Sequence, residues 1–326
     1  MADLQPPTGV DQVRVRIAVL TFRRPDDIAA ALPRLVEQAR AVTDDRTTAD
    51  IVVVDNDPEA SARSAVSRLA AASAEIAIGY EHEPTPGIAA ARNRALDTAA
   101  DVDLLVFIDD DERPTPSWLA LLLRTYAEHH SAAVVGPVVS EFDETPSDWI
   151  TAGRFFDRLR RPTGTPVVVA ATNNLLLDLH QIRRLVLRFD EAFGLSGGSD
   201  TLFTRELDRR GGRLVWCDEA VVTDVVPASR TTRSWVVRRA LRSGNSWSRT
   251  SLELSGSPAQ RTAVRLRLCG QGLVRLAGGG ARLAAGVVTR SPGQRARGIR
   301  TLARSAGLLS GAWGYVYQEY RRRPKP

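Results

Sequence analysis

Short apolar runs alternate with longer segments of helical spacing over the first two hundred residues of this 326-residue chain. Three of the runs end in polar or acidic residues: VRVRIAVLTF (13–22), IVVVDND (51–57) and DLLVFIDDD (103–111). Helix-like sequence follows the first run from Pro25, and another helix is expected from Pro116. Such alternation predicts a mostly parallel, Rossmann-like sheet flanked by helices, which is an α/β fold.

The rest of the body is less regular. Further strands are expected at IAIGYEHE (76–83), AAVVGPVV (132–139) and WCDEAVVTDVVP (216–227). Residues 140–172 are expected to be irregular, and no element is assigned to the VVVAATNNLLLD run (167–178) at their end.

Polar residues stand where the predicted strands end. Thr21 and Arg23 follow the first strand, Asp55 ends the second, and Asp109 to Asp111 end the fourth. Parallel sheets bind their ligands at the carboxyl ends of the strands. These residues are therefore expected to share one site.

The acidic cluster has two interpretations. On an extended strand end, Asp109 and Asp111 share a face and Asp110 points the other way. Two carboxylates on one face can hold a hard divalent cation that keeps positions free for phosphate oxygens. The alternative is a solvated strand end whose acids cap the next helix.

The net charge of +6 is unevenly distributed along the chain. Residues 255–326 hold 13 Arg, one Lys and one Glu, a charge of +13, so residues 1–254 carry −7. We expect a catalytic body over 1–254 and a basic, amphipathic helical region over 255–326, although its many glycines disfavour helix. The charge of that region predicts an anionic partner.

Composition also bears on the compartment. Cys217 and Cys269 are far apart and lack metal-ligand spacing, which favours a reducing cytosol. Residues 1–12 do not have the pattern of a secretory signal. The most apolar stretch, GLVRLAGGGARLAAGVV (272–288), is interrupted by arginines, so no membrane span is expected.

Four segments in order, VLTFRRP (19–25), VVVDND (52–57), PTPGIAAARNRAL (84–96) and VFIDDDERP (106–114), together resemble family 2 glycosyltransferases of the GT-A fold. The resemblance covers about residues 13–250 and implies a nucleotide-binding half over about 13–140 and an acceptor half over about 141–254. The nucleotide-binding residues that we expect on this basis are Thr21, Arg23, Asp55, Gly87, Ala91, Arg92, Asn93, Asp109 and Asp110. An Asp-x-Asp motif implies that Asp109 and Asp111 ligate Mg²⁺ or Mn²⁺ on the donor diphosphate.

The resemblance continues through GLSGGSDTLFTREL (194–207), which looks like the acceptor segment of the family, and implies that Asp200 is the catalytic base. Many members have a glutamate where this chain has Ser199. An N-cap is the alternative role for Asp200. Residues 221–247 are similar to bacterial polysaccharide transferases of the succinoglycan type, and Asp224 is expected on the metal side.

The implied activity is inverting transfer of a sugar, by single displacement, from a nucleotide-diphosphate sugar, expected to be a UDP-sugar. The acceptor is expected to be a hydroxyl of a glycan, lipid-linked or not. Arg230, Arg238 and Arg239 are candidates for contacts with the diphosphate. The sequence names neither the sugar nor the linkage.

Two other functions remain open at this point. A nucleotidyltransferase would need a Gly- and Lys-rich loop after the first strand, where this chain has TFRRPDD (21–27). A non-catalytic scaffold would tolerate Asp200→Asn and hydrolyse no nucleotide sugar.

The basic region is expected to attach peripherally to the anionic inner face of a membrane, where each basic residue contributes about 1 kcal/mol. The alternative is a solvated basic surface. Nucleic acid is not expected, because no recognition motif is present. The residues of an interfacial aromatic and basic cluster are Trp313, Tyr315, Tyr317, Tyr320 and Arg321 to Arg323.

Overall fold

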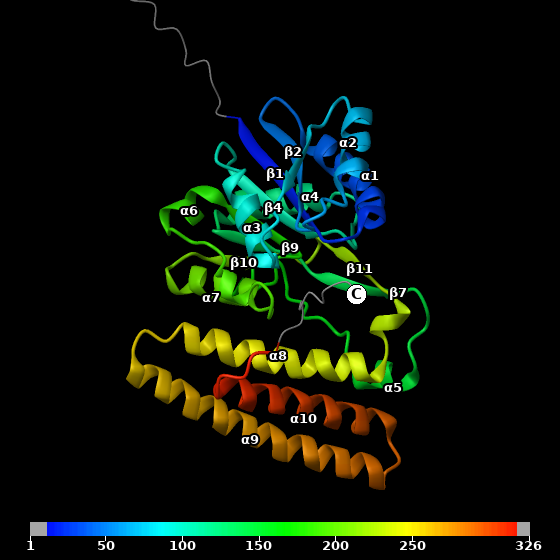
Figure 1. Cartoon of the computed structure of the whole chain (residues 1–326), viewed down its shortest axis with the longest axis vertical. Coiled ribbons are helices and arrows are strands. Elements are labelled where there is room, and N and C mark those ends of the chain that lie inside the picture. Colours follow the sequence, from blue (N-terminus) through cyan, green and yellow to red (C-terminus); the bar gives the residue numbers. More distant parts are fainter. Residues whose placement is uncertain (1–11, 318–326) are drawn as a thin grey trace, which may run out of the picture.

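The computed structural model of the chain describes residues 12–317, and its body is built on an eight-stranded sheet (Figure 1). The strand order is β3-β2-β1-β4-β9-β6-β10-β8. The strands are β1 (Val13–Thr21), β2 (Thr47–Asp55), β3 (Ile78–His82), β4 (Leu104–Asp109), β6 (Ala133–Val135), β8 (Pro166–Val167), β9 (Asn174–Asp178) and β10 (Leu214–Trp216).

Parallel pairing of the first four strands brings their polar ends to one edge of the sheet. Thr21 lies opposite Asp55, and Asp55 lies opposite His82. Leu20 lies opposite Asp109, so the acidic end of β4 stands beside the end of β1. The parallel register of these strands thus brings their polar ends together, as the sequence predicted.

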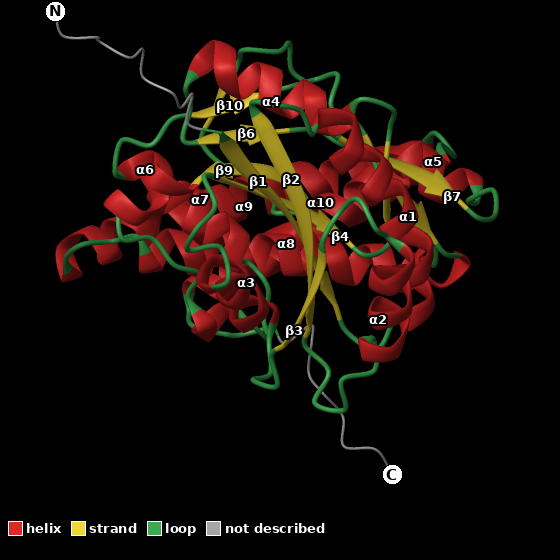
Figure 2. Cartoon of the chain, turned by 90° about the horizontal axis from the view of Figure 1, so that it is seen from above, coloured by secondary structure: helices red, strands yellow, loops and turns green. Residues whose placement is uncertain are grey.

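Helices cover both faces of this sheet (Figure 2). The first helix begins at a proline that needs no hydrogen-bonded N–H there, carries two acids in its first turn, and buries Ile28, Leu32 and Leu35 at helical spacing. The helices of the body are α1 (Pro25–Val42), α2 (Arg63–Ala72), α3 (Ile88–Asp97), α4 (Trp118–His129), α5 (Asp148–Gly153), α6 (Leu179–Arg184) and α7 (Ser199–Arg209).

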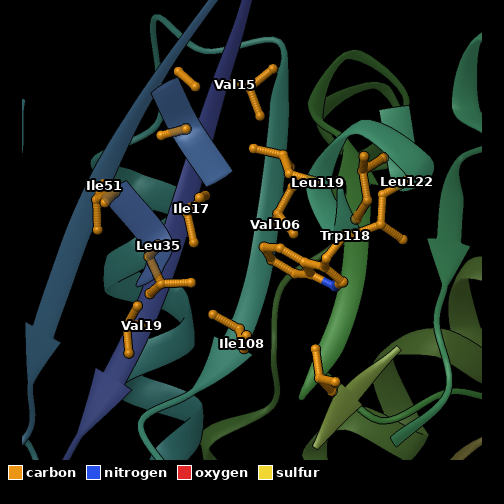
Figure 3. Close-up of a cluster of buried hydrophobic side chains, with 14 of the residues drawn as sticks. Val15, Ile17, Val19, Leu35, Ile51, Val106, Ile108, Trp118, Leu119 and Leu122 are labelled. Carbon is orange, nitrogen blue, oxygen red and sulfur yellow. The ribbon is translucent and has the colours of Figure 1, made fainter. Parts of the chain in front are cut away.

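The core between the sheet and α1 and α4 is closely filled (Figure 3). Ile17, Val106 and Trp118 are fully buried there. Each such side chain stabilises the fold by about 1.5–3 kcal/mol. The Trp118 indole N–H donates to Asn174 Oδ1 at 2.9 Å, which ties α4 to β9.

β9 corrects the sequence-based expectation for this segment. All five of its residues are buried, and it pairs antiparallel with both β4 and β6 in the middle of the sheet. A short strand covered on both faces lacks alternation, so its pattern resembles any brief apolar run.

A second sheet has three strands, in the order β5 (Glu112–Pro114), β11 (Val222–Val226) and β7 (Val138–Phe142). Two single strands were expected where the chain changes sheets, at 132–139 and 216–227. The first divides at Gly136 and Pro137, because a proline cannot donate to a ladder. A Cβ on Gly136 would lie 2.2 Å from Asn174 Nδ2, so this crossing requires glycine.

Three long helices form a layer beneath the body: α8 (Arg233–Glu253), α9 (Pro258–Val288) and α10 (Pro292–Ala312) (Figure 1). α10 packs against α9, α8 and α5. Glycine makes this closeness possible, since a Cβ on Gly244 would lie 2.1 Å from the Arg304 carbonyl and one on Gly307 would lie 1.9 Å from the Leu241 carbonyl. The expected helices are present, and glycines such as Gly244 and Gly307 serve as helix contacts that offset their unfavourable helix propensity.

In residues 12–317, none of the helices has the length and apolar character needed to cross a membrane. Tyr320 and Arg321 to Arg323, which were assigned to an interfacial cluster, lie outside the described residues.

Candidate active site

The acidic cluster lies where β4 ends and the chain turns into β5. Asp109 is the last residue of β4, and Asp110 and Asp111 form the turn. Arg24 Nη1 is 2.9 Å from Asp110 Oδ1 and 2.9 Å from Asp111 Oδ2. The predicted separation of Asp110 from Asp111 was therefore wrong, because strand alternation stops at Asp109.

Asp110 and Asp111 are held by neighbours from distant segments. The Thr21 hydroxyl donates to Asp110 Oδ2 at 2.8 Å. Arg230 Nη1 donates to Asp111 Oδ2 at 3.1 Å. Burial nevertheless raises the pKa of Asp110 to about 6, opposed mainly by Arg24.

Asp109 and Glu112 are less well compensated. No described residue donates a hydrogen bond to the Asp109 side chain, and burial, with help from Asp111, raises its pKa to about 7 while Arg92 opposes the rise. Burial and Asp109 together raise the pKa of Glu112 well above its usual range. Asn173 Nδ2 donates to Glu112 Oε1 at 2.7 Å. The cluster thus has an excess of negative charge.

The carboxylates of the acidic cluster suit a divalent cation, because carboxylate oxygens are its preferred ligands and no described residue donates a hydrogen bond to Asp109. In residues 12–317 no group of three or more acidic, His or Cys side chains stands ready as a complete cage. A cation that uses one or two carboxylates and takes the rest of its oxygens from substrate phosphates needs no such cage. Asp109 and Asp111 fit that arrangement.

Asp200 lies in the first turn of α7 and lines a cavity of about 230 Å³. Its Oδ1 accepts a hydrogen bond from the Thr201 amide at 2.7 Å, and no described group donates to its Oδ2. Gly197 and Gly198, both with positive φ, leave the approach to this carboxylate open. Asp200 is also among the charges that raise the pKa of Asp109.

Arg92 links the two acidic groups. Its Nη1 donates to the Ser199 hydroxyl at 2.6 Å, and its charge acts on Asp109. Ser199 is fully buried, and its hydroxyl accepts this arginine hydrogen bond.

The remaining residues of the predicted nucleotide half support loops. Asp55 is fully buried and accepts from the Asp57 and Ala62 amides and the Tyr80 hydroxyl. Arg23 Nε pairs with Asp57 Oδ1 at 3.2 Å. Their roles in nucleotide binding stay predictions.

Gly87 and Asn93 join this half to the acceptor segment. Gly87 has a φ of 126° and its missing Cβ would lie 3.2 Å from the Gly194 backbone. Asn93 exchanges two hydrogen bonds with the backbone of Phe189, and Ala91 is buried in α3. The Ala-Arg-Asn segment thus positions residues 189–194, and its contacts with nucleotide stay predictions.

The candidate phosphate-binding arginines differ in placement. Arg239 is stacked on Trp235 and Phe156, and burial together with Arg158 lowers its pKa to about 10 while Asp224 opposes the fall. Arg238 is exposed and bonds only Ser234. Arg230 is thus brought to the acidic cluster through Asp111, Arg239 lies near Asp224, and Arg238 lies at the surface.

Asp224 stands on β11 opposite Glu112 of β5 and accepts from Arg158 Nη2 at 2.7 Å. The expected role of Asp224 on the metal side stays a prediction.

Reading the sequence missed Arg24, Glu112 and Arg158. Arg24 adjoins the selected Arg23, and Glu112 completes the DDDE run, so both stood within segments already singled out. Arg158 lies in the stretch expected to be irregular, where the sequence offered no signal.

Comparison with known proteins places this geometry in context. The family model described as "Glycosyl transferase family 2" matches residues 16–188. The succinoglycan biosynthesis protein ExoM of Rhizobium meliloti (strain 1021) is 34% identical over 243 residues, which cover 74% of this chain and 77% of ExoM.

Two solved structures share the fold. The mannosyltransferase PcManGT from Pyrobaculum calidifontis, in complex with GDP-Man and Mn²⁺, has a TM-score of 0.60 at 18% identity, covering 93% of this chain and 88% of that one. S. aureus TarS (residues 1–349) in complex with UDP-GlcNAc has a TM-score of 0.51 at 13% identity, covering 89% and 90%.

Proposed function

This chain belongs to glycosyl transferase family 2, and on that premise we propose that it moves a sugar from a nucleotide-diphosphate donor, a UDP-sugar, to a hydroxyl of a growing glycan with inversion at the anomeric carbon. It is a glycosyltransferase with an α/β, GT-A fold, as predicted, which disfavours the nucleotidyltransferase and scaffold alternatives. Similarity to a succinoglycan biosynthesis protein supports a role in polysaccharide biosynthesis.

One observation carries this proposal. Arg92 and Asp200, from helices far apart in sequence, line one cavity. Arg92 donates to the Ser199 hydroxyl beside Asp200 at 2.6 Å, and its charge also acts on Asp109. This arrangement supports one site that holds both the metal-binding carboxylates and the base.

On the donor side, Mg²⁺ or Mn²⁺ would be held by Asp109 and Asp111, with Asp224 nearby. Such an ion offsets the charge that grows on the diphosphate as the sugar leaves. The Mn²⁺ in the PcManGT complex supports this choice. Arg230 and Arg239 then contact phosphate oxygens.

On the acceptor side, Asp200 accepts the proton of the attacking hydroxyl at Oδ2. The new bond forms between the acceptor's hydroxyl oxygen and the anomeric carbon. The bond from the anomeric carbon to the diphosphate oxygen breaks, which releases the nucleoside diphosphate. A positioned base of this kind contributes about 10²–10⁴-fold to the rate.

The division into a body over 1–254 and a basic region over 255–326 is part of the proposal, and so is attachment of that region to an anionic membrane surface. Successive helix residues are turned by about 100°. Arg275 and Arg282 of α9 therefore share one side of the helix, and Arg267 borders the apolar residues on its outer face. The exposed apolar residues of that face are Leu266, Leu273, Val274, Leu276, Val287 and Val288.

An apolar face bordered by arginines, in a region without acids, is suited to anionic lipid. We expect the protein to sediment with vesicles that contain phosphatidylglycerol and to be released as salt rises. Equal binding to neutral vesicles, or none to either, would contradict attachment.

The function is tested by calorimetric titration of UDP, GDP and dTDP with Mn²⁺ and with chelator, on the unmodified chain and on Asp111→Asn. We expect UDP binding that needs both the metal and Asp111. No binding of any nucleotide would overturn the proposed donor and return the cluster to a solvated strand end.

A further inference from the structure

Three hollows between the body and the helical layer meet at one side chain, Arg304 of α10. The first is the cavity of about 230 Å³ that holds Asp200, and Arg242 and Trp247 of α8 also line it. The second, of about 380 Å³, lies between α8, α9 and α10. The third, of about 480 Å³, lies between α5, α9 and α10. Arg304 lines all three, so they surround one point.

Arginine dominates the two outer hollows. Arg205, Arg267, Arg275 and Arg304 line the second. The third is lined by Arg154, Arg275, Arg282, Arg297, Arg300 and Arg304. Volumes of this size are within the range of small-molecule sites, which is about 300–1,000 Å³.

The described residues supply little negative charge to balance these arginines. Asp157, which pairs with Arg154, is the acid in the lining of the third hollow. Arg297 and Arg300 donate to backbone carbonyls at the end of α5. In residues 258–312, which form α9, α10 and their connection, the sequence has ten Arg and no Asp, Glu or Lys.

Burial and the gathered positive charges lower the pKa values of Arg304 and Arg300. Arg304 is solvent-exposed because it faces open hollows, yet partial burial and the charges of Arg275 and Arg300 lower its pKa. Burial, with contributions from Arg154 and Arg297, also lowers the pKa of Arg300, although Asp157 opposes the fall. Gathered like charges destabilise a fold unless an anion joins them.

Simple solubility does not account for the cluster. The exposed apolar residues of α9, such as Leu273, Val274 and Val288, line neither outer hollow, whereas the exposed Arg275 and Arg282 do. Six of the ten arginines in residues 258–312 line the outer hollows, and Arg304 also lines the cavity that holds Asp200.

We propose that these hollows bind the phosphate or diphosphate group of the acceptor and so place its hydroxyl at Asp200. This inference rests on the proposed function, because it assigns Asp200 to the acceptor side. Arginine forms paired hydrogen bonds with phosphate oxygens, and several arginines around one point suit a group with more than one negative charge. The proposed function places the donor diphosphate at the metal held by Asp109 and Asp111 and at Arg230 and Arg239, so the acceptor phosphate would occupy a second anion site next to Asp200.

The test compares two variants that each lose two charges from the helical layer. Arg275→Gln/Arg304→Gln removes two side chains of the hollows. Arg261→Gln/Arg290→Gln is the matched control, because both residues are exposed on the same layer and line none of the three hollows. Binding of inorganic pyrophosphate and of farnesyl diphosphate is followed through Trp247 fluorescence, with chelator present so that the metal-dependent donor site is silent.

We expect both diphosphates to bind the unmodified chain and the control, and to bind the Arg275/Arg304 variant at least about tenfold more weakly. Tighter binding of farnesyl diphosphate than of pyrophosphate would identify a lipid-borne group, and equal binding a water-soluble phosphorylated acceptor. No binding to the unmodified chain, equal binding to both variants, or binding of phosphatidylglycerol vesicles alone would overturn the proposal.

UDP titration with Mn²⁺ on the same proteins separates this inference from the proposed function. We expect the Arg275/Arg304 variant to bind UDP as the unmodified chain does. Loss of UDP binding in the unmodified chain would refute the donor assignment, while the diphosphate result would still be measured independently.

Discussion

The strand-end cluster and the helical layer have opposite charge imbalances and obtain them by different means. At the strand ends, parallel register gathers Asp109 and its neighbours, and Arg24, Arg92 and Arg230 offset part of their charge. In the helical layer, glycines bring helices close together and arginines gather with few acids. Each region is thus left with a charge that a ligand of the opposite sign can neutralise.

The opposite charges of the two regions indicate that each suits a different substrate of the proposed reaction. Carboxylates of raised pKa suit a cation and the donor diphosphate. Unbalanced arginines suit an anion on the other substrate. Asp200 stands between them and belongs to both surroundings.

The largest effect is expected from Asp200→Asn. Loss of the base should lower kcat by about 10²–10⁴-fold while UDP binding is kept. Ser199→Ala is the control, because it alters the adjacent contact with Arg92 and leaves the carboxylate. Steady-state kinetics with calorimetric UDP binding separates the two effects, and full activity of Asp200→Asn would show that Asp200 serves only the first turn of α7, whose N-cap is Gly198.

Next comes the packing that supports the helical layer. Gly307→Ala places a Cβ 1.9 Å from the Leu241 carbonyl and should destabilise the fold by about 1–3 kcal/mol. Gly280→Ala has open space and should stabilise α9 by about 0.5–1 kcal/mol. Chemical unfolding of both variants measures the contrast, and equal midpoints would contradict the role given to glycine contacts.

The acidic cluster should reveal itself through pH. In the folded chain the pKa of Asp109 is raised to about 7 and that of Asp110 to about 6, both above their unfolded values near 3.8. Between these limits the folded state binds more protons than the unfolded state, so the free energy of unfolding falls as pH rises from about 4 to 7.

We expect a fall on the order of 5 kcal/mol across that range in metal-free protein, because each unit by which the two pKa values are raised corresponds to about 1.4 kcal/mol. Asp109→Asn should flatten the dependence, and urea unfolding at several pH values provides the measurement. A stability that rises with pH in the same window would show that the cluster is better compensated than its contacts indicate.

The smallest effect expected is on donor affinity. Arg239→Gln should weaken UDP binding about tenfold, since it removes one charge-assisted contact with phosphate. Arg238→Gln, one residue away and exposed, should leave affinity unchanged. Equal losses would point to a diffuse electrostatic effect in place of direct contact.

Much of the fold followed from the sequence because the first strands of a parallel sheet are continuous apolar runs with polar ends. β1, β2 and β4 were recognisable for that reason. β9 was missed because a five-residue buried strand has no period to read, and the break at Gly136 and Pro137 was missed because it depends on the approach of Asn174 from elsewhere.

The site was predictable to the level of segments. In the RR pair after β1, Arg23 was selected, but its φ of 58° directs it to Asp57, and Arg24 reaches the acidic cluster instead. Loop geometry of this kind is set by tertiary contacts and leaves no periodic trace. The arginine hollows require three helices to be placed together, which no single segment encodes.

α8 contributes residues to both regions, and it therefore sets the distance between them. Arg239 stands beside Asp224 near its beginning, and Trp247 lines the Asp200 cavity eight residues later. One unbroken helix therefore fixes a spacing of about 12 Å along its axis between the residues proposed to contact the donor and the acceptor. The distance between the proposed donor and acceptor contacts would then depend on the length of α8 between Arg239 and Trp247. An inserted helical turn would lengthen it, and a single inserted residue would rotate one contact by about 100° relative to the other.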